Sequence, residues 1–229
     1  MKTVGIIGGL GPETTAKFYL KLVFGCYKKN KINRPPILLW NIPLDYQIEQ
    51  DLIISSKGEE RYIPYLIDAA KRLEKGGADF LVMPCNSLHI YIDEIRTAVK
   101  IPVLNIVEET VKFLKIKNVD KVGLLATTSL IKHELYQNML TKFGIKDYLP
   151  DKSDQNNIGD LINNLVLNKY SEQNKEQLLQ IISKFKTIGL KTIILACTDL
   201  QLLIPKYPQL EIYDTMKIFA DSTVDNILS

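Results

Sequence analysis

The stretch "GADFLVMPCNSL" at residues 77–88 returns in outline as "GLKTIILACTDL" at residues 189–200. Each copy begins with a glycine, continues through apolar residues and reaches a cysteine eight positions after that glycine. Each cysteine is followed by small polar residues of the kind that cap helices. We interpret both stretches as buried strands that end at Cys85 and at Cys197, with a helix starting just after each cysteine.

The repeat extends to a second pair of stretches. "TVGIIGGLGPETTAKFYLKL" (3–22) resembles "KVGLLATTSLIKHELYQNML" (121–140), with Val-Gly, two apolar residues, a turn of small residues and then a helical pattern. Strands that alternate with helices indicate parallel sheets covered on both faces. We therefore predict an α/β fold of two pseudo-symmetric domains, each with a parallel sheet in an αβα layer structure.

The expected elements and domains can be stated by residue number. Strands are predicted at 3–9, 36–42, 79–84 and 102–106, and helices at 12–28, 61–78, 87–99 and 107–116. The first domain is expected to comprise residues 1–100 plus about 206–229, and the second about 101–205. Ligands of open α/β sheets bind outside the carboxyl ends of the strands. Two such domains facing each other would form one cleft with a cysteine on each wall.

Composition excludes several classes of protein. The 229 residues carry a formal net charge of +3 from scattered lysines, with no basic block, so no nucleic-acid partner is expected. No apolar run reaches the ~20 residues of a membrane helix, and none at the N-terminus suits a signal peptide. Three cysteines form no disulfide framework. We expect a cytoplasmic protein with reduced thiols.

Paired thiols suit one kind of chemistry particularly well. The start of a helix favours a thiolate, and Asn86, Ser87 and Thr198 add donors that could receive a carboxylate. One thiolate can remove a proton from one face of a carbon while a thiol delivers a proton to the other face, which inverts a stereocentre without a cofactor. A zinc site needs more ligands, and a C-x-x-C redox pair is absent. We expect no metal and no cofactor.

With these residues identified, the chain resembles the cofactor-independent aspartate/glutamate racemase family. The resemblance is carried by "GIIGGLGPETT" (5–15), "MPCNSLH" (83–89), "GLLATTSL" (123–130) and "LACTDL" (195–200). It implies two pseudo-symmetric domains with the active site between them, a homodimer, and a small amino acid as substrate. It also implies that Cys85 and Cys197 are the catalytic thiols, with Cys85 taking the proton from the D-isomer and Cys197 from the L-isomer.

The resemblance further implies a set of substrate contacts. They fall at Gly9, Leu10, Asn86, Ser87, Thr127, Thr128 and Thr198. Aspartate-specific members carry an arginine where this chain has Ile48, which puts aspartate as substrate in question. Gln47 or Lys169 could substitute for that arginine. His89, four residues after Cys85, could face the thiolate on a helix and tune it.

The sequence-based hypothesis is a pyridoxal-phosphate-independent racemase that interconverts L- and D-aspartate, with glutamate as a further candidate. A hydantoin racemase, or a related dicarboxylate isomerase or decarboxylase, stays open within the same superfamily. A third hypothesis is of another class, a non-catalytic protein whose two lobes close on a small acid. Turnover across a panel of amino acids separates the enzymes from the binding protein.

Overall fold

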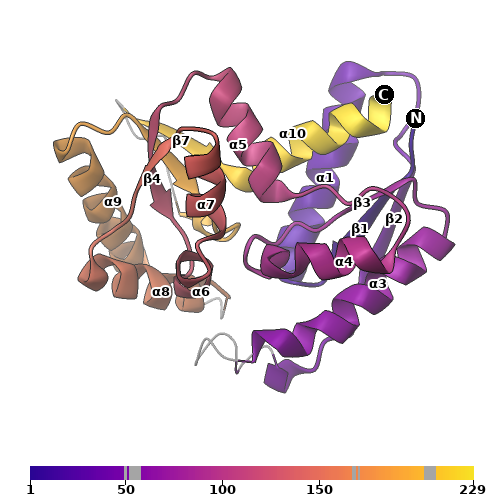
Figure 1. The fold of residues 1–229 in the computed structure, drawn as a ribbon, viewed down its shortest axis with the longest axis horizontal. Helices are drawn as coiled ribbons and strands as arrows, with labels where there is room; N and C mark the ends of the chain where they lie inside the picture. The colour runs from indigo at the N-terminus through magenta and orange to yellow at the C-terminus, as the bar shows by residue number, and fades with distance from the viewer. Residues whose placement is uncertain (49–50, 52–57, 167–168, 170, 204–209) are drawn as a thin grey trace. The chain divides into compact units, whose positions relative to one another are not determined.

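The computed structural model describes residues 1–48, 51, 58–166, 169, 171–203 and 210–229 (Figure 1). The chain forms two compact units. Unit 1 consists of Met1–Glu109 and Met216–Ser229, and unit 2 of Thr110–Thr215. The sequence predicts that the chain crosses between the domains near residues 101 and 206.

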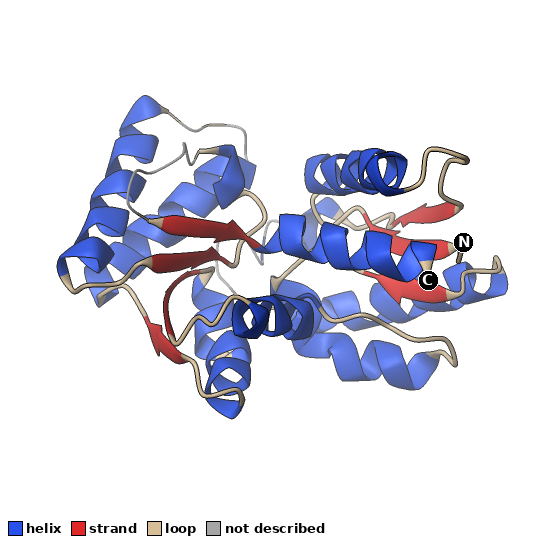
Figure 2. Ribbon diagram, turned by 90° about the horizontal axis from the view of Figure 1, so that it is seen from above, coloured by secondary structure: helices blue, strands red, loops and turns tan. Residues whose placement is uncertain are grey.

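Unit 1 is built on a parallel sheet in the order β2-β1-β3. Its strands are β1 (Val4–Gly8), β2 (Ile37–Asn41) and β3 (Phe80–Val82). Its helices are α1 (Pro12–Lys29), η1 (Glu59–Tyr62), α3 (Ile63–Lys75), η2 (Ser87–Tyr91), α4 (Ile92–Ala98), the first turn of α5 (Ile106–Ile116), and α10 (Thr215–Leu228). Figure 2 shows helices on both sides of the strands in each unit.

Unit 2 repeats this construction around a parallel sheet in the order β5-β4-β6-β7. Its strands are β4 (Lys121–Leu125), β5 (Lys146–Tyr148), β6 (Thr192–Leu195) and β7 (Glu211–Asp214). Its helices are α6 (Thr128–Lys132), α7 (Leu135–Lys142), α8 (Lys152–Val166), α9 (Glu172–Thr187) and η3 (Leu200–Leu202), together with the rest of α5. The predicted fold class, two α/β units with parallel sheets, is confirmed.

Burial explains why the repeated stretches are nearly all apolar. Every residue of β1, β3 and β6 is buried, as are the last four residues of β4. A parallel strand covered by helices on both faces has no solvent side, so its residues do not alternate between apolar and polar. These are the strands whose carboxyl ends carry the candidate site residues.

Three local predictions from the sequence differ from the structure. The strand expected at 102–106 is a single bridge between Val103 and Leu81, because Pro102 has no N–H to donate and α5 already begins at Ile106. The helix expected at 87–99 opens as the 3₁₀ helix η2. The helix after β4 is broken into α6 and α7 at Glu134, which has a φ of 53°.

Within the described part of the chain, none of the helices combines the length and the apolar character needed to cross a membrane.

Candidate active site

In unit 1, the candidate residues follow two neighbouring strands. β1 pairs with β3 in parallel register, from Val4 opposite Phe80 to Ile6 opposite Val82. The carboxyl ends of parallel neighbours lie at the same edge of a sheet. Leu10, two residues after β1, and Cys85, three residues after β3, pack against the same apolar cluster. The structure therefore brings these two predicted site residues to one edge of the unit 1 sheet.

The turn after β1 requires a glycine at position 9. Gly9 has a φ of +86°, and a Cβ there would lie 2.9 Å from the main-chain nitrogen of Ile42. The Gly9 N–H donates to Oγ1 of Thr15 at 3.1 Å, and that hydroxyl donates to the carbonyl of Gly11 at 3.0 Å. Thr15 thus holds the turn from within α1. Because the Gly9 amide is engaged by Thr15, it is not a free seat for a carboxylate.

Cys85 is fixed through its own main chain. Its N–H donates to the carbonyl of Met83 at 2.9 Å, and its carbonyl lies 2.7 Å from Nδ1 of His89. The side chain of Cys85 is half-buried, whereas Asn86 is only 2 % exposed and accepts at its carbonyl from the N–H of His89. Ser87 follows as the first residue of η2. His89 therefore contacts the main chain of Cys85, in contrast to the direct approach to the sulfur expected from the sequence.

In unit 2, the residues after β4 form a helix start. Thr127 is the N-cap of α6, and its Oγ1 accepts from the N–H of Leu130 at 3.2 Å. Thr128 is the first residue of α6. The Gln155 side chain, from α8, donates through Nε2 to the carbonyl of Ala126 at 3.0 Å. Gln155 was missed by the sequence analysis because its partner is a carbonyl 29 positions away.

Cys197 has a different environment from Cys85. The N–H of Ala196 donates to the carbonyl of Leu125, so the exit of β6 is tied to the end of β4. Cys197 is 7 % exposed, and its Sγ lies 3.8 Å from Oδ2 of Asp199, to which the thiol can donate. Thr198 is also buried, at 6 % exposure. Asp199 was quoted in the motif but given no role, because sequence alone does not show that its carboxylate turns back toward the sulfur.

The candidates for holding a substrate side chain, Gln47 and Lys169, have different surroundings. Gln47 donates through Nε2 to Oδ1 of Asp51 at 2.8 Å, and the other carboxylate oxygen accepts from Nη2 of Arg61 at 2.8 Å. The Arg61 and Gln47 hydrogen bonds hold the pKa of Asp51 below its ordinary value. Ile48 is partly buried against the same apolar cluster as Cys85. Lys169 is exposed, beyond the end of α8.

Among the described residues, no group of three or more His, Cys, Asp or Glu side chains could hold a metal ion. Each unit carries one candidate cysteine a few residues beyond the carboxyl end of a strand that pairs with the first strand of its own sheet. This arrangement defines an α/β protein with a thiol in each unit.

Comparison with known proteins identifies the family. Residues 7–223 match the family model described as Asp/Glu/Hydantoin racemase. The chain belongs to this family, and at that level it is an amino-acid racemase. The match extends over most of both units and covers three of the four motifs that carried the resemblance, together with residues 7–15 of the first motif.

Individual relatives agree with this assignment. The broad specificity amino-acid racemase RacX of Bacillus subtilis (strain 168) is 29 % identical over 231 residues, which cover 99 % of this chain and 98 % of RacX. An aspartate racemase structure from Picrophilus torridus is 25 % identical, with a TM-score of 0.82 over 99 % of this chain and 94 % of that one. A crystal structure from Yersinia pestis, provisionally described as an Asp/Glu racemase, is 28 % identical, with a TM-score of 0.88 over the whole of both chains.

Proposed function

We propose that this racemase inverts the α-carbon of a free amino acid by a two-base mechanism in which Cys85 and Cys197 exchange the roles of base and acid. The observation that carries the proposal is the equivalent placement of the two thiols, each just beyond the carboxyl end of a strand paired with the first strand of its own sheet. No bound cofactor takes part in the proposed reaction. The proposal requires both thiols to reach one substrate carbon from opposite faces.

The proposed reaction moves one proton from the α-carbon to a thiolate and a second proton from the opposite thiol to the α-carbon. A thiolate takes the α-proton, so an S–H bond forms, the C–H bond breaks and its electron pair passes into the enolate of the substrate carboxylate. The opposite thiol then gives its proton to the other face of the carbon and becomes a thiolate. Positioned donors must stabilise the developing enolate charge. We assign that task to the predicted contacts Leu10, Asn86, Ser87, Thr127, Thr128 and Thr198, and leave out Gly9 because its amide donates to Thr15.

Asp199 supports a starting state for the two thiols. A thiol that donates to a carboxylate is favoured over the thiolate, because a neighbouring negative charge opposes a second one. The 3.8 Å contact with Asp199 therefore favours Cys197 as the protonated partner. Cys85 is then the first base, which suits a D-isomer as the first substrate under the family's assignment of roles.

Aspartate is the first substrate to test, since the resemblance and the relative from Picrophilus torridus point to it. A specific observation favours a second candidate, a neutral or varied side chain. Ile48 packs on apolar residues where an arginine would hold a second carboxylate, and the amide of Gln47 is engaged by Asp51. A bidentate arginine is difficult to replace at such a position. The broad specificity of RacX agrees with this second candidate.

The experiment is a panel of single L- and D-amino acids incubated with the purified protein and analysed by chiral chromatography. Aspartate, glutamate and asparagine stand beside neutral side chains such as alanine, methionine and homoserine. Turnover of aspartate and glutamate alone supports an acidic substrate, and turnover of several neutral amino acids supports the second candidate. Tight binding of one acid with no turnover of any would refute the racemase proposal and favour a binding protein.

We also propose that the protein works in the cytoplasm as a homodimer, as the family resemblance implies. Size-exclusion chromatography with light scattering measures the mass directly. A mass of twice 26.1 kDa is expected, and a monomer at working concentration contradicts this part of the proposal.

A further inference from the structure

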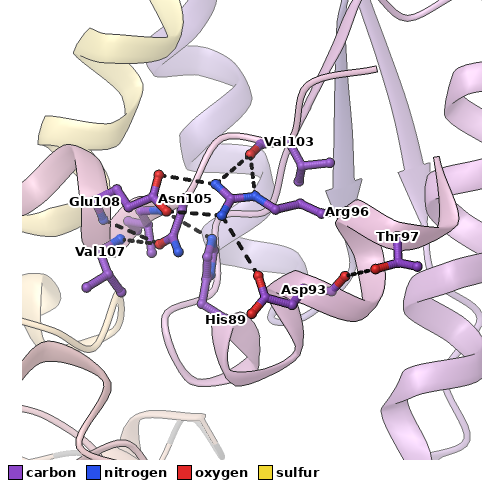
Figure 3. A network of polar contacts seen from close by, with 9 residues as sticks. His89, Asp93, Arg96, Thr97, Val103, Asn105, Val107 and Glu108 are labelled. Atoms are coloured by element: carbon purple, nitrogen blue, oxygen red, sulfur yellow. Dashed lines mark hydrogen bonds and ion pairs between the residues drawn. The ribbon is translucent and has the colours of Figure 1, made fainter. Parts of the chain in front are cut away.

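A buried imidazole ties the Cys85 turn to the start of a distant helix. His89 is fully buried, with 0 % exposure. Its Nδ1 lies 2.7 Å from the carbonyl oxygen of Cys85, and its Nε2 accepts from the main-chain N–H of Ile106 at 3.2 Å. Figure 3 shows the ring between the turn that carries it and the first residues of α5.

The two partners define the protonation state of the ring. A carbonyl oxygen can only accept, so the contact with Cys85 requires a proton on Nδ1 of His89. A main-chain N–H can only donate, so the contact with Ile106 requires a lone pair on Nε2. The ring is therefore the neutral tautomer that carries its proton on Nδ1. A doubly protonated ring would lose the contact with Ile106.

The surroundings hold the ring in that neutral state. Burial, together with the charge of Arg96, lowers the pKa of His89 to about 4, against the opposing effects of the Cys85 and Leu104 carbonyls and of Glu108. Phe219 from α10 meets the ring edge-on, with 6.2 Å between the centroids. The ring therefore stays neutral throughout the pH range in which a thiol can work.

Further hydrogen bonds hold residues 103–108, the segment whose Ile106 N–H donates to His89. Arg96 from α4 makes two hydrogen bonds to the carboxylate of Glu108, at 3.0 and 3.1 Å, and donates to the carbonyl of Val103 at 3.1 Å (Figure 3). Asn105 caps α5, since its Oδ1 accepts from the N–H of Val107 at 2.8 Å. These contacts hold residues 103–108 in place on either side of the N–H that His89 receives.

We infer that His89 is a positioning residue for Cys85, which it holds by its main-chain carbonyl rather than through the sulfur. With the N–H of Cys85 bound to Met83 and its carbonyl bound to His89, both main-chain polar groups of the nucleophile's residue are fixed. The direction of the thiol is then set by one remaining side-chain rotation. The inference rests on the proposed function, because only a working thiol at position 85 needs such precision.

Two substitutions separate the two hydrogen bonds of the ring. The amide nitrogen of asparagine lies about as far from the main chain as Nδ1 of histidine, so His89→Asn can keep the donor to Cys85 while losing the contact with Ile106. The amide oxygen of glutamine reaches about as far as Nε2, so His89→Gln can keep the acceptor for Ile106 while losing the donor to Cys85. Both variants carry a side-chain amide, and they differ in which of the two hydrogen bonds of His89 they can keep.

The test measures the thiol itself as well as turnover. Each variant is made in a background with Cys26→Ser and Cys197→Ser, and the rate of alkylation of Cys85 by iodoacetamide is followed against pH. Racemisation is measured separately with both active cysteines present. His89→Gln should shift the midpoint of the alkylation profile and lower kcat on the order of tenfold to a hundredfold, with little change in KM, since misplacing a catalytic group has effects of that size. His89→Asn should stay within about threefold of the parent in kcat and keep the parent's midpoint.

Three results would overturn the inference. In the first, His89→Gln keeps the parent's alkylation midpoint and kcat. In the second, both variants lose kcat equally and unfold at equally lower urea concentrations while the midpoint stays, which indicates a purely structural role. The third result applies if His89→Gln does not fold, so that His89→Asn must decide alone. In that case, a folded His89→Asn whose alkylation midpoint differs from that of the parent would overturn the inference. Because alkylation needs no substrate, these results stand apart from any failure of the racemase proposal.

Discussion

The two cysteine turns share a place in the fold but not the groups that support them. The Cys85 carbonyl is held by the buried ring of His89, which lies four residues further along the chain. The equivalent residue after Cys197 is Gln201, whose side chain donates to the carbonyl of Thr198 at 2.6 Å. Cys197 has Asp199 beside its sulfur, where the first turn has Ser87.

The two units share the strand exits but differ in the polar groups around them. A two-base racemase needs one thiol and one thiolate at any moment, so identical surroundings would not distinguish the two. In the proposed mechanism, the carboxylate of Asp199 beside one sulfur and the neutral imidazole of His89 behind the other turn would supply that distinction.

The largest effect is expected from removing either thiol. Cys85→Ser and Cys197→Ser should each lower racemisation by about a thousandfold or more, because a hydroxyl is a far weaker base than a thiolate and acid–base catalysis contributes that much. Chiral chromatography of the best substrate measures the loss. Cys26→Ser is the matched control, since Cys26 is fully buried in unit 1 and burial raises the pKa of its thiol. A single active-site variant with near-parent turnover would make one of the thiols dispensable.

The ionisable group behind Cys85 should make stability depend on pH. His89 has a folded-state pKa of about 4, against 6.5 in the unfolded chain, so the unfolded state binds the proton more readily. The folded protein keeps His89 neutral, and this contributes to the free energy of unfolding in full above pH 6.5. The contribution is lost as the pH falls from 6.5 through 4, which lowers the free energy of unfolding by about 3 kcal/mol.

Urea unfolding of the parent and of His89→Asn at neutral pH and near pH 4 isolates this contribution. The parent should lose about 3 kcal/mol more than the variant over that range. Arg96 and Glu108, the charged groups that act on the ring, remain in both proteins. Equal losses in the two proteins would show that His89 is not held neutral.

The support of the other turn begins two residues before Cys197. The Thr215 hydroxyl donates to the carbonyl of Leu195 at 2.8 Å and is hydrogen-bonded to the buried phenol of Tyr136. Thr215→Val should lower the free energy of unfolding by about 1–3 kcal/mol, because it leaves buried polar groups without a partner.

Thr223→Val provides the matched control for that change. Thr223 is equally buried, but its hydroxyl donates to the carbonyl of Phe219 within the same helix. Such a bond duplicates the helical one, so its loss should cost less than about 1 kcal/mol. Denaturant unfolding measures both variants. If Thr215→Val and Thr223→Val lower the free energy of unfolding equally, the contact of Thr215 with Leu195 does not support the turn.

The smallest effect concerns the carboxylate beside Cys197. Asp199→Asn removes a negative charge next to the sulfur, so the thiolate should form at lower pH and alkylation of Cys197 near neutral pH should be up to about tenfold faster. The alkylation of Cys85 in the same variant is the internal control and should not change. A Cys197 profile that does not move would remove the proposed distinction between the two sulfurs.

Much of the fold follows from the sequence because apolar strands and glycine turns are local signals. The strands that precede Gly9, Cys85, Thr127 and Cys197 were placed correctly, and their parallel pairing followed from the alternation of strands with helices. The strand expected at 102–106 failed because a proline and an early helix cap leave room for one bridge only.

The site was predicted less completely, since its supports come from distant positions. Thr15 lies inside α1 and Gln155 inside α8, and neither differs in type from ordinary helix residues. His89 was noticed by its spacing from Cys85, but only the structure reveals that its ring reaches the carbonyl and then Ile106. Long-range side-chain contacts of this kind leave no periodic signal in the chain.

The central claim, that two thiols work on opposite faces of one carbon, is tested most directly by the fate of the α-proton. The amino acid that turns over fastest is supplied as one pure isomer in D₂O, and both isomers are separated early in the reaction and analysed by mass spectrometry. The account predicts deuterium at the α-carbon of the product isomer, while the remaining substrate keeps its protium. A product that retains protium, or a substrate that gains deuterium as fast as product forms, would show that a single base serves both faces and would contradict the account.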